Sequence, residues 1–410
     1  EAYYKKNANV LCYTIYFTQN NVFEKIKEKS KNKIQWLDIQ KPEVLKVVDV
    51  DSRNALREFL SSEYDVLWKK VSTALLSEFI PMFYIENFKP YLKASKKYLK
   101  KHPHLKVCYT SAIGMMCFPH FFMIYAQMKK NIIIADMQHG GNYGIGDYVY
   151  NPDCSVLDCF FAWGKWVYDV SDTSCLMKLC PSHKLANCYD GQEQRKDYIL
   201  YVGSYLEPYP NYYSYERGLS SNIKYIERQI EFFNALSQNV ISQMLLREVY
   251  VDFGYHIDDI IARHFPKLKI QNFKQENYTT KLDINSRNFS FANTLLNCSL
   301  CIYDDIESPF TEALYCNKPV ILLLDKKRYK LREEEKTYFK AMYEAKLLFY
   351  EPKDLASLLN KINNKIDDWW NEKERQKVVK LIQNRYVSHN ENLNEWWADE
   401  LINLCHLHDK

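Results

Sequence analysis

The feature that most constrains this fold is an alternation of short apolar segments with amphipathic segments, and it occurs twice along the 410 residues. Short apolar runs are typical of strands buried on both faces of a parallel sheet, and the segments between them have helical spacing. Strands that alternate with helices indicate an α/β fold with helices on both faces of the sheet. In the first half we expect strands at 9–17, 33–39, 106–111, 131–137 and 158–164, and helical segments at 22–29, 55–101 and 115–130.

The second half repeats the scheme after a polar stretch, DGQEQRKD at 190–197. Further strands are expected to begin at 198 and within 242–252, and to lie at 268–273, 298–305 and 319–325, followed by a helical tail. We therefore predict two Rossmann-like domains, residues 1–194 and 195–388, and a C-terminal helix at 389–410 that packs back on the first domain.

Composition excludes some classes of protein. The net charge of +4 is too weak to indicate nucleic-acid binding, and no stretch has the ~18 consecutive apolar residues of a membrane-spanning helix. One segment departs from the average: residues 88–106 carry seven lysines and no acidic residue. Such a run is either a solvated helix face or a patch for anionic lipid. We predict a cytoplasmic protein with peripheral contact at the inner face of the membrane.

Two acidic residues, Asp49 and Asp51, form a DxD pattern of the kind that holds a metal–nucleotide pair in one fold of nucleotide-dependent enzymes, which usually has a single α/β domain. A cap role for Asp51 in front of the helical segment SRNALREFL explains the pattern more simply. Two α/β halves also disfavour that other fold. We therefore predict no metal site and no cofactor.

The most unusual loop is QHGGNYGIGDY, which follows the expected strand at 131–137. Four of the ten glycines of the chain lie between residues 140 and 146. Gly140 and Gly141 allow close approach of a ligand, and His139 and Gln138 offer hydrogen-bonding groups at the strand end. We expect His139 to act as a cationic hydrogen-bond donor or a general base, with the cationic role slightly favoured. Asp136 and Asp147 are the nearest carboxylates that could serve as base or nucleophile.

Other expected strand ends also carry polar residues. Ligands of open parallel sheets bind beyond the carboxyl ends of the strands. Arg247 suits a phosphate or a carboxylate, unless it pairs with Asp252. Weaker signals come from a serine that ends the strand at 106–111 and from a small pair that follows the strand at 198: Ser111, Gly203 and Ser204.

A helix start at SPFTEALYC forms the last predicted part of the site. Ser308 is a good N-cap and Pro309 suits the first helical position, so the helix should begin at a strand end. Helix N-termini bind phosphate groups. Thr311 could add a hydroxyl, and Glu312 could accept hydrogen bonds from a ribose.

The order of these motifs resembles a family of surface-polysaccharide transferases first described in spirochaetes. The segments that carry the resemblance, within residues 105–390, are IADMQHGGNYG, DCFFAWG, LREVYVDFGY, SPFTEALYCNKPVILLLDKKRYKLREEEKTYFKAMYEAKLLFYEP and DDWW. The chain is more distantly similar to retaining transferases that move Kdo or pseudaminic acid from CMP donors. This resemblance implies a GT-B fold, with the acceptor site mainly in the N-terminal domain and the nucleotide-sugar site mainly in the C-terminal one. It carries over to Gln138, His139, Gly140, Gly141, Arg247, Asp252, Gly254, Ser308, Thr311 and Glu312.

The residues and the resemblance together predict a glycosyltransferase that uses a nucleotide-activated sugar. The sugar could be a CMP-linked nonulosonic acid or Kdo, and the acceptor a surface glycan, a lipid-linked molecule or a protein. Two alternatives stay open. One is another enzyme on the same plan, either a polyol-phosphate transferase with a CDP donor or a sugar-nucleotide epimerase. The other is a non-catalytic binding protein that kept the fold, because fold alone does not determine function.

Overall fold

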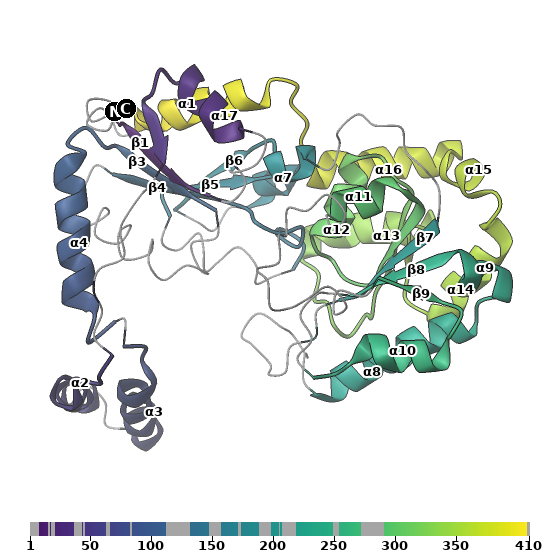
Figure 1. Ribbon diagram of the computed structural model, residues 1–410, viewed down its shortest axis with the longest axis horizontal. Helices are drawn as coiled ribbons and strands as arrows, with labels where there is room; N and C mark the ends of the chain where they lie inside the picture. The colour runs from purple at the N-terminus through teal and green to yellow at the C-terminus, as the bar shows by residue number, and fades with distance from the viewer. Residues whose placement is uncertain are drawn as a thin grey trace. The chain divides into compact units, whose positions relative to one another are not determined.

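The computed structural model contains two six-stranded sheets with flanking helices (Figure 1). It describes residues 8–14, 17, 21–36, 43, 46–62, 66–82, 84–111, 132–146, 157–170, 174–187, 198–204, 206, 219–248, 254–271 and 291–407. Every strand pairing whose register is described is parallel. The α/β fold with two sheets in series, expected of a GT-B-like chain, is confirmed.

The first sheet has the strand order β2-β1-β3-β4-β5-β6. The elements are β1 (Val10–Tyr13), α1 (Val22–Lys29), β2 (Ile34–Trp36), α2 (Val50–Ser62), α3 (Leu67–Phe79), α4 (Phe88–Lys101), β3 (Val107–Thr110), β4 (Ile133–Met137), β5 (Cys159–Ala162), the 3₁₀ helix η4 (Lys165–Asp169), β6 (Leu176–Leu179) and α7 (His183–Ala186). The helix expected at 115–130 lies outside the described residues.

The second sheet has the order β12-β11-β10-β7-β8-β9. Helices lie on both of its faces: α8 packs with α10 and α14, and α12 packs with α16 (Figure 1). The elements are β7 (Tyr198–Val202), α8 (Leu219–Asn234), α9 (Gln238–Gln243), β8 (Met244–Arg247), α10 (Ile257–His264), β9 (Lys269–Ile270), α11 (Phe291–Leu296), β10 (Cys298–Tyr303), α12 (Ser308–Tyr315), β11 (Val320–Leu323), η5 (Glu333–Glu335), α13 (Lys336–Glu344), β12 (Leu348–Phe349), α14 (Pro352–Ile362), α15 (Ile366–Trp370), α16 (Lys373–Tyr386) and α17 (Leu393–Leu404).

The chain forms two compact units whose boundaries differ from those of the two sheets, since β6 of the first sheet falls in the second unit. One unit comprises residues 1–137, 156–159 and 394–410, and the other comprises 138–155 and 160–393. The boundary predicted at 194/195 falls outside the described residues, between the end of β6 and the start of β7, and it stays a prediction.

Residues 394–410, which include nearly all of the C-terminal helix α17, belong to the first compact unit. The ring of Trp397, which is fully buried, lies 5.5 Å from the ring of Phe17 and 5.2 Å from that of Tyr109. Tyr109 lies on β3, so the last helix packs against a strand of the first sheet. Burial of an indole contributes a large apolar area, which fixes the end of the chain to this core.

The helical region expected at 55–101 consists of three helices. Its first helix, α2, begins at Val50, and Asp49 caps it: the Asp49 carboxylate accepts hydrogen bonds from the backbone N–H of Ser52 (3.1 Å) and the Ser52 hydroxyl (2.7 Å). The expectation that Asp51 is the cap was wrong: the cap is Asp49, two residues earlier, and Asp51 lies in the first turn. The structural explanation of the DxD pattern nevertheless holds, because one of its two carboxylates caps a helix.

Candidate functional site

The carboxyl ends of three central strands lie in register in the second unit. Val202 of β7 pairs with Arg247 of β8 and with Tyr303 of β10. The residues that follow these strands, Gly203, Glu248 and Asp304, therefore meet at one edge of the sheet. This edge is where open parallel sheets bind ligands.

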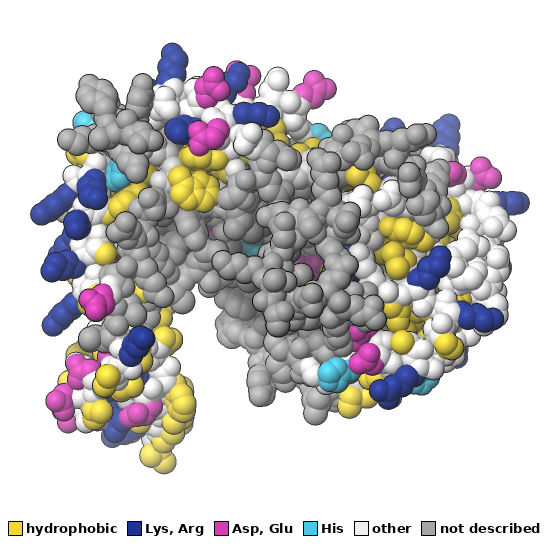
Figure 2. Space-filling view, viewed as in Figure 1, with side chains coloured by type: hydrophobic (Ala, Val, Ile, Leu, Met, Phe, Trp, Pro, Cys, Tyr) yellow, Lys and Arg dark blue, Asp and Glu magenta, His cyan; other side chains and the backbone are white. Residues whose placement is uncertain are grey.

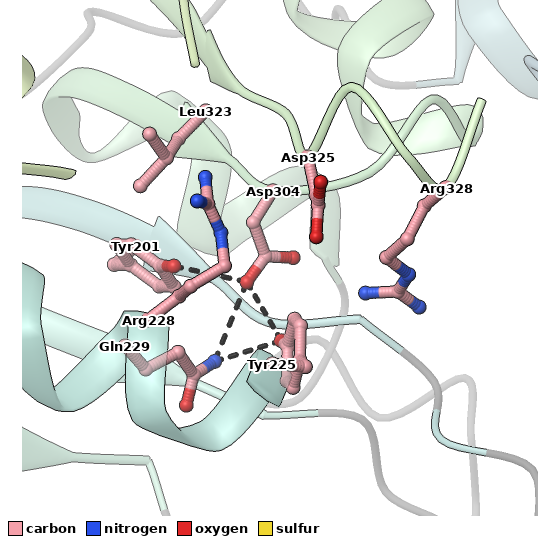
Figure 3. A pocket seen from close by; sticks show the side chains of 8 residues that line it. All are labelled: Tyr201, Tyr225, Arg228, Gln229, Asp304, Leu323, Asp325 and Arg328. Atoms are coloured by element: carbon pink, nitrogen blue, oxygen red, sulfur yellow. Dashed lines mark hydrogen bonds between the residues drawn. The ribbon is translucent and has the colours of Figure 1, made fainter. Parts of the chain in front are cut away.

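A buried hydrogen-bond network occupies part of this edge (Figure 3). The Asp304 carboxylate accepts hydrogen bonds from the hydroxyls of Tyr201 (2.9 Å) and Tyr225 (2.6 Å) and from the Gln229 amide (3.3 Å). The Ser204 hydroxyl lies 2.8 Å from Asp304 Oδ1. The cavity beside these groups has a volume of about 10 Å³, close to that of one water site. The network is therefore a structural polar core, and Ser204 belongs to it.

Gly203 makes room for a half-buried acid, Glu248, that the sequence did not single out. A Cβ at Gly203 would lie 2.1 Å from Oε2 of Glu248. Burial raises the pKa of Glu248 to about 8, with a further contribution from the charge of Asp304. Gly203 thus has a packing role toward Glu248, whereas the sequence suggested contact with a ligand. The sequence signal for this packing role is Glu248 itself, an acidic residue directly after the expected strand-end residue Arg247.

The glycine loop after β4 contacts the start of α12. A Cβ at Gly141 would lie 2.4 Å from the carbonyl oxygen of Glu307 and 2.9 Å from the backbone nitrogen of Ser308. The Asn142 amide donates a hydrogen bond of 2.9 Å to the Glu307 carboxylate. The absence of a side chain at Gly141 therefore serves close packing of loop on helix. Close approach of a ligand at this glycine, as the sequence suggests, stays a prediction.

Lys184 on the short helix α7 joins the loop to α12, and the sequence did not predict it. Its ammonium donates to the Ser308 hydroxyl (2.6 Å) and to the carbonyl oxygen of His139 (3.5 Å). It also lies 3.8 Å from Oε1 of Glu312. Helix α7 begins where Ser182 accepts a hydrogen bond from the backbone N–H of Leu185 (3.3 Å), which fixes the direction of its first turn.

His139 is oriented by Tyr143, whose hydroxyl lies 2.7 Å from Nδ1 of the ring. Burial, together with the nearby charge of Lys184, lowers the pKa of His139 from 6.5 to about 4. In the protein without ligand, the ring is therefore neutral at physiological pH. This corrects the expected preference for an imidazolium, because the cation placed at this site is Lys184.

Gln138 holds the loop in place through both ends of its amide. The side-chain nitrogen donates to the carbonyl oxygen of Gly140 (2.7 Å), and the side-chain oxygen accepts from the backbone N–H of Trp163 (2.9 Å). The residue is 1% exposed, so these bonds are made away from water. Gln138 is thus a positioning residue, and a direct catalytic contact is not supported.

The start of α12 lies within one residue of the predicted position. Glu307 is the N-cap, Ser308 opens the helix and Pro309 follows. Glu312 is nearly buried beside Lys184. Thr311 is fully buried, and its hydroxyl donates to the carbonyl oxygen of Ser308 (2.9 Å), which does not support a ligand contact.

Arg247 is half-buried and is held by neutral groups. It donates to Oε1 of Gln271 (2.9 Å) and to the hydroxyl of Thr294 (3.0 Å). Burial lowers its pKa to about 10, while the charge of Glu312 acts in the opposite direction. The negative charge of Glu312 therefore stabilises the positive charge of Arg247, and Lys184 lies near the same carboxylate. Its alternative partner Asp252 lies outside the described residues.

The remaining predicted residues have separate environments. Asp136 is 1% exposed in the first unit and accepts hydrogen bonds from the Thr110 hydroxyl (3.1 Å) and the backbone N–H of Met137 (2.8 Å). Ser111, in the same unit, shares a hydrogen bond of 2.6 Å with Thr14. Gly254 has a positive φ of 93°, which explains a glycine there by backbone conformation. Asp147 lies outside the described residues.

A larger cavity of about 350 Å³ lies at the carboxyl end of β11 in the second unit. Its lining includes Lys326, Lys330, Lys336, Tyr329 and Tyr350. Tyr329 donates a hydrogen bond to Asp305, two residues before the cap of α12. Leu331, also in the lining, forms a bridge with Gly146 of the glycine loop. The cavity wall is thus connected to both the loop and the helix start.

Among the described residues, no group of histidine, cysteine and acidic side chains is arranged to hold a metal ion. In the same parts of the chain, no helix is long and apolar enough to cross a membrane.

Comparison with solved structures finds chains of similar fold at low identity. The S. aureus MnaA–UDP co-structure is 9% identical with a TM-score of 0.47, covering 97% of this chain and 96% of that one. The wall teichoic acid polymerase TagF is 10% identical with a TM-score of 0.43, covering 100% and 92%. The glycosyltransferase SnogD from Streptomyces nogalater is 9% identical with a TM-score of 0.42, covering 97% and 100%.

No curated protein matches the sequence. One protein family does match, over residues 2–401, and its description is "LIC12162 family transferase". Because the match spans nearly the whole chain, the protein belongs to the LIC12162 family of transferases.

Proposed function

We propose that the protein is a glycosyltransferase that moves a sugar from a nucleotide donor to a cell-surface glycan, lipid-linked or protein acceptor. One observation carries the proposal: the Lys184 ammonium, the Ser308 hydroxyl and the first turn of α12 meet beside His139. The first-turn N–H groups of a helix have no partner within the helix and favour an anion. A cation and a helix N-terminus at one place suit the phosphate groups of a nucleotide donor.

In this proposal Lys184 stabilises the charge that develops on the leaving phosphate. Cations and amides that are already in place act most strongly where water is excluded. Glu312, beside Lys184, is proposed to accept hydrogen bonds from the ribose, and Arg247 to contact a phosphate or a sugar carboxylate. Since these protein cations would supply the countercharge, the transfer is proposed to need no divalent ion, and activity in the presence of EDTA tests that point.

His139 is proposed as the general base that takes the proton from the acceptor hydroxyl. A base must be unprotonated before the reaction, and a pKa of about 4 leaves the ring neutral at pH 7. Tyr143 holds the ring through Nδ1. This assignment replaces the cationic role because Lys184 already supplies the positive charge.

The donor is proposed to be a CMP-linked acidic sugar, a nonulosonic acid or Kdo. The cavity of about 350 Å³ falls in the size range of small-molecule sites and has three lysines in its lining. A sugar that carries a carboxylate would complement those lysines. This point refines the donor class, and the proposed transferase activity does not depend on it.

The test is calorimetry of CMP, CDP, UDP and GDP binding to the full chain, with Lys184→Gln as the diagnostic variant. Loss of a charged hydrogen bond to phosphate should weaken nucleotide binding by ~1.5–3 kcal/mol, or about 10- to 150-fold. Lys165→Gln is the matched control, because Lys165 is an exposed lysine of the same unit. Equal affinity in all three proteins would remove Lys184 from the donor site.

The nucleotide preference distinguishes the possible donors. Tightest binding of CMP supports the proposal, CDP would indicate a polyol-phosphate transferase, and UDP an epimerase or a UDP-sugar transferase. A folded protein that binds none of the four would contradict nucleotide-dependent transfer. In a transfer assay with the preferred donor, His139→Ala should lose ~100-fold or more in turnover while remaining folded.

A further inference from the structure

Helix α3 presents its apolar side chains to solvent and buries its small polar ones. Thr73 and Ser77 are buried, 8% and 0% exposed. Leu67, Val71, Leu75 and Phe79, spaced four residues apart, are 77%, 51%, 52% and 79% exposed. Residues at this spacing form one stripe along a helix. A helix of a globular protein normally turns such a stripe toward the core, so the arrangement in α3 is reversed.

The stripe is part of a wider apolar surface on the α2–α3 hairpin (Figure 2). Trp68 and Leu76 flank it at 65% and 50% exposure. Phe59 of α2 is 63% exposed. Single exposed apolar side chains are common, but a contiguous group of this kind marks an interaction surface.

Buried polar contacts fix the hairpin in this orientation. Arg53 of α2 donates to both carboxylate oxygens of Glu86, at 2.6 and 3.0 Å, and both side chains are almost fully buried. Arg53 also donates to the carbonyl oxygens of Ser77 (3.0 Å), Glu78 (2.8 Å) and Ile80 (3.0 Å), at the end of α3. Rotating α3 to bury the apolar stripe would break these charged hydrogen bonds, which are costly to leave unmade.

The next helix carries the lysine run seen in the sequence. Helix α4 begins at Phe88, two residues after Glu86, and it contains six lysines and no acidic residue. In Figure 2 lysine side chains line the edge of the molecule along α4, and apolar side chains gather on the hairpin that precedes it. An apolar helix face next to a concentration of positive charge complements an anionic lipid surface.

We propose that the α2–α3 hairpin docks on an anionic phospholipid bilayer, with the apolar face of α3 in the interfacial region and the lysines of α4 near the headgroups. A second copy of the chain fits less well, because a symmetric contact through this face would bring two lysine-rich helices toward one another. Trp68 suits the interfacial depth, since an indole has an apolar body and a polar N–H. The docking is independent of the proposed donor site, which lies in the other unit.

Vesicle sedimentation of the full chain tests the proposal. The protein should sediment with vesicles of phosphatidylglycerol and phosphatidylcholine, and much less with phosphatidylcholine alone. The double variant Trp68→Ser/Phe79→Ser should lose at least tenfold in vesicle partitioning, although its net charge is unchanged.

The triple variant Lys93→Gln/Lys97→Gln/Lys100→Gln tests the lysines of α4. It should bind vesicles more weakly than the wild type, and its remaining binding should no longer depend on salt concentration. All five substituted side chains are exposed, so unfolding is not expected.

Insertion of Trp68 into the bilayer can be measured separately, by fluorescence quenching. Lipids brominated in their chains should quench the wild-type fluorescence more strongly than that of Trp68→Phe, which keeps an apolar side chain but removes the indole. The control Ile223→Ser/Leu381→Ser removes two exposed apolar side chains of the other unit, 52% and 43% exposed, and should bind vesicles like the wild type.

Two results would overturn the proposal. One is equal sedimentation of the wild type and Trp68→Ser/Phe79→Ser. The other is a dimer, seen by light scattering, that Trp68→Ser/Phe79→Ser dissociates while the wild type binds no vesicles, since the face would then be an interface between copies.

Discussion

His139 is surrounded by groups that no local pattern in the sequence connects to it. Its ring contacts Tyr143, four residues away, but the cation next to its backbone is Lys184, 45 residues further along the chain. Together with burial, that charge makes the ring a weak base. The same contact sets the division of roles in the proposed reaction, with the positive charge on Lys184 and the proton acceptor at His139.

The low pKa of His139 predicts a pH dependence of stability. In the unfolded chain histidine titrates near 6.5, whereas in the folded protein the value is about 4. Between these values the unfolded chain binds a proton that the folded protein does not. The free energy of unfolding should therefore fall as pH decreases from about 6.5 to about 4, by ~1–3 kcal/mol from this residue, and the full contribution is present above pH 6.5.

Thermal unfolding of the wild type and His139→Gln at pH 7 and pH 5 measures the effect. His139→Gln removes the titrating ring, so the difference in Tm between the two pH values should shrink. His256→Gln, at an exposed histidine, is the control and should behave like the wild type. An unchanged pH difference in His139→Gln would show that the ring titrates alike in the folded and unfolded states.

At the scale of elements, the packing of the glycine loop on α12 determines the site. The backbone of Gly141 comes so close to Glu307 and Ser308 that no Cβ fits. This contact brings the carbonyl oxygen of His139 and the hydroxyl of Ser308 to one ammonium. The two glycines differ in this respect, because a Cβ at Gly140 would meet only the side chains of Asn142 and Glu307, at 3.2 Å.

This difference gives a matched pair of variants. Gly141→Ala should destabilise the protein by ~1–3 kcal/mol, since backbone atoms must move to admit the methyl group. It should also weaken nucleotide binding by separating the loop from α12. Gly140→Ala should have a smaller effect on both, because two side chains can adjust. Denaturant unfolding and calorimetry measure the two quantities, and equal effects of the two substitutions would contradict the packing argument.

At the scale of the whole molecule, the last helix belongs to the core of the first unit. Helix α17 follows the elements of the second unit in sequence, yet residues 394–410 cluster with residues 1–137. Its anchor is Trp397, against Phe17 and Tyr109. Lys29 of α1 adds an exposed ion pair with Glu395 at 3.2 Å, which contributes little by itself.

Trp397→Ala should therefore destabilise the first unit selectively. Removal of a fully buried indole typically costs ~3–5 kcal/mol, through lost apolar burial and the cavity left behind. Hydrogen exchange followed by mass spectrometry should show faster exchange in β1 and β3, with little change in β10 and β11. Trp396→Ala, at the neighbouring half-buried tryptophan, is the control and should have the smaller effect. Uniform acceleration across both sheets would mean that the two units unfold together.

The sequence by itself determined the elements and their class. The run Ile132–Ile134 indicated a buried strand, and β4 lies there with all five residues buried. The pair Ser308–Pro309 indicated a helix start, and α12 begins at Ser308. Signals of this kind are local, because burial of a strand and capping of a helix depend on residues a few positions apart. Helix breaks are less marked in the sequence: a helical region was expected at 55–101 without its divisions, and the structure divides it into α2, α3 and α4.

Only the tertiary structure decided which side chains meet. Lys184 and Ser308 are 124 residues apart in sequence and 2.6 Å apart in space. Gly141 and Gly203 are recognisable as flexible residues, but their need for a missing side chain comes from the backbone of Glu307 and the carboxylate of Glu248. Contacts of this kind depend on how strand-end loops from different elements pack, and nothing in the spacing of residues along the chain specifies that packing.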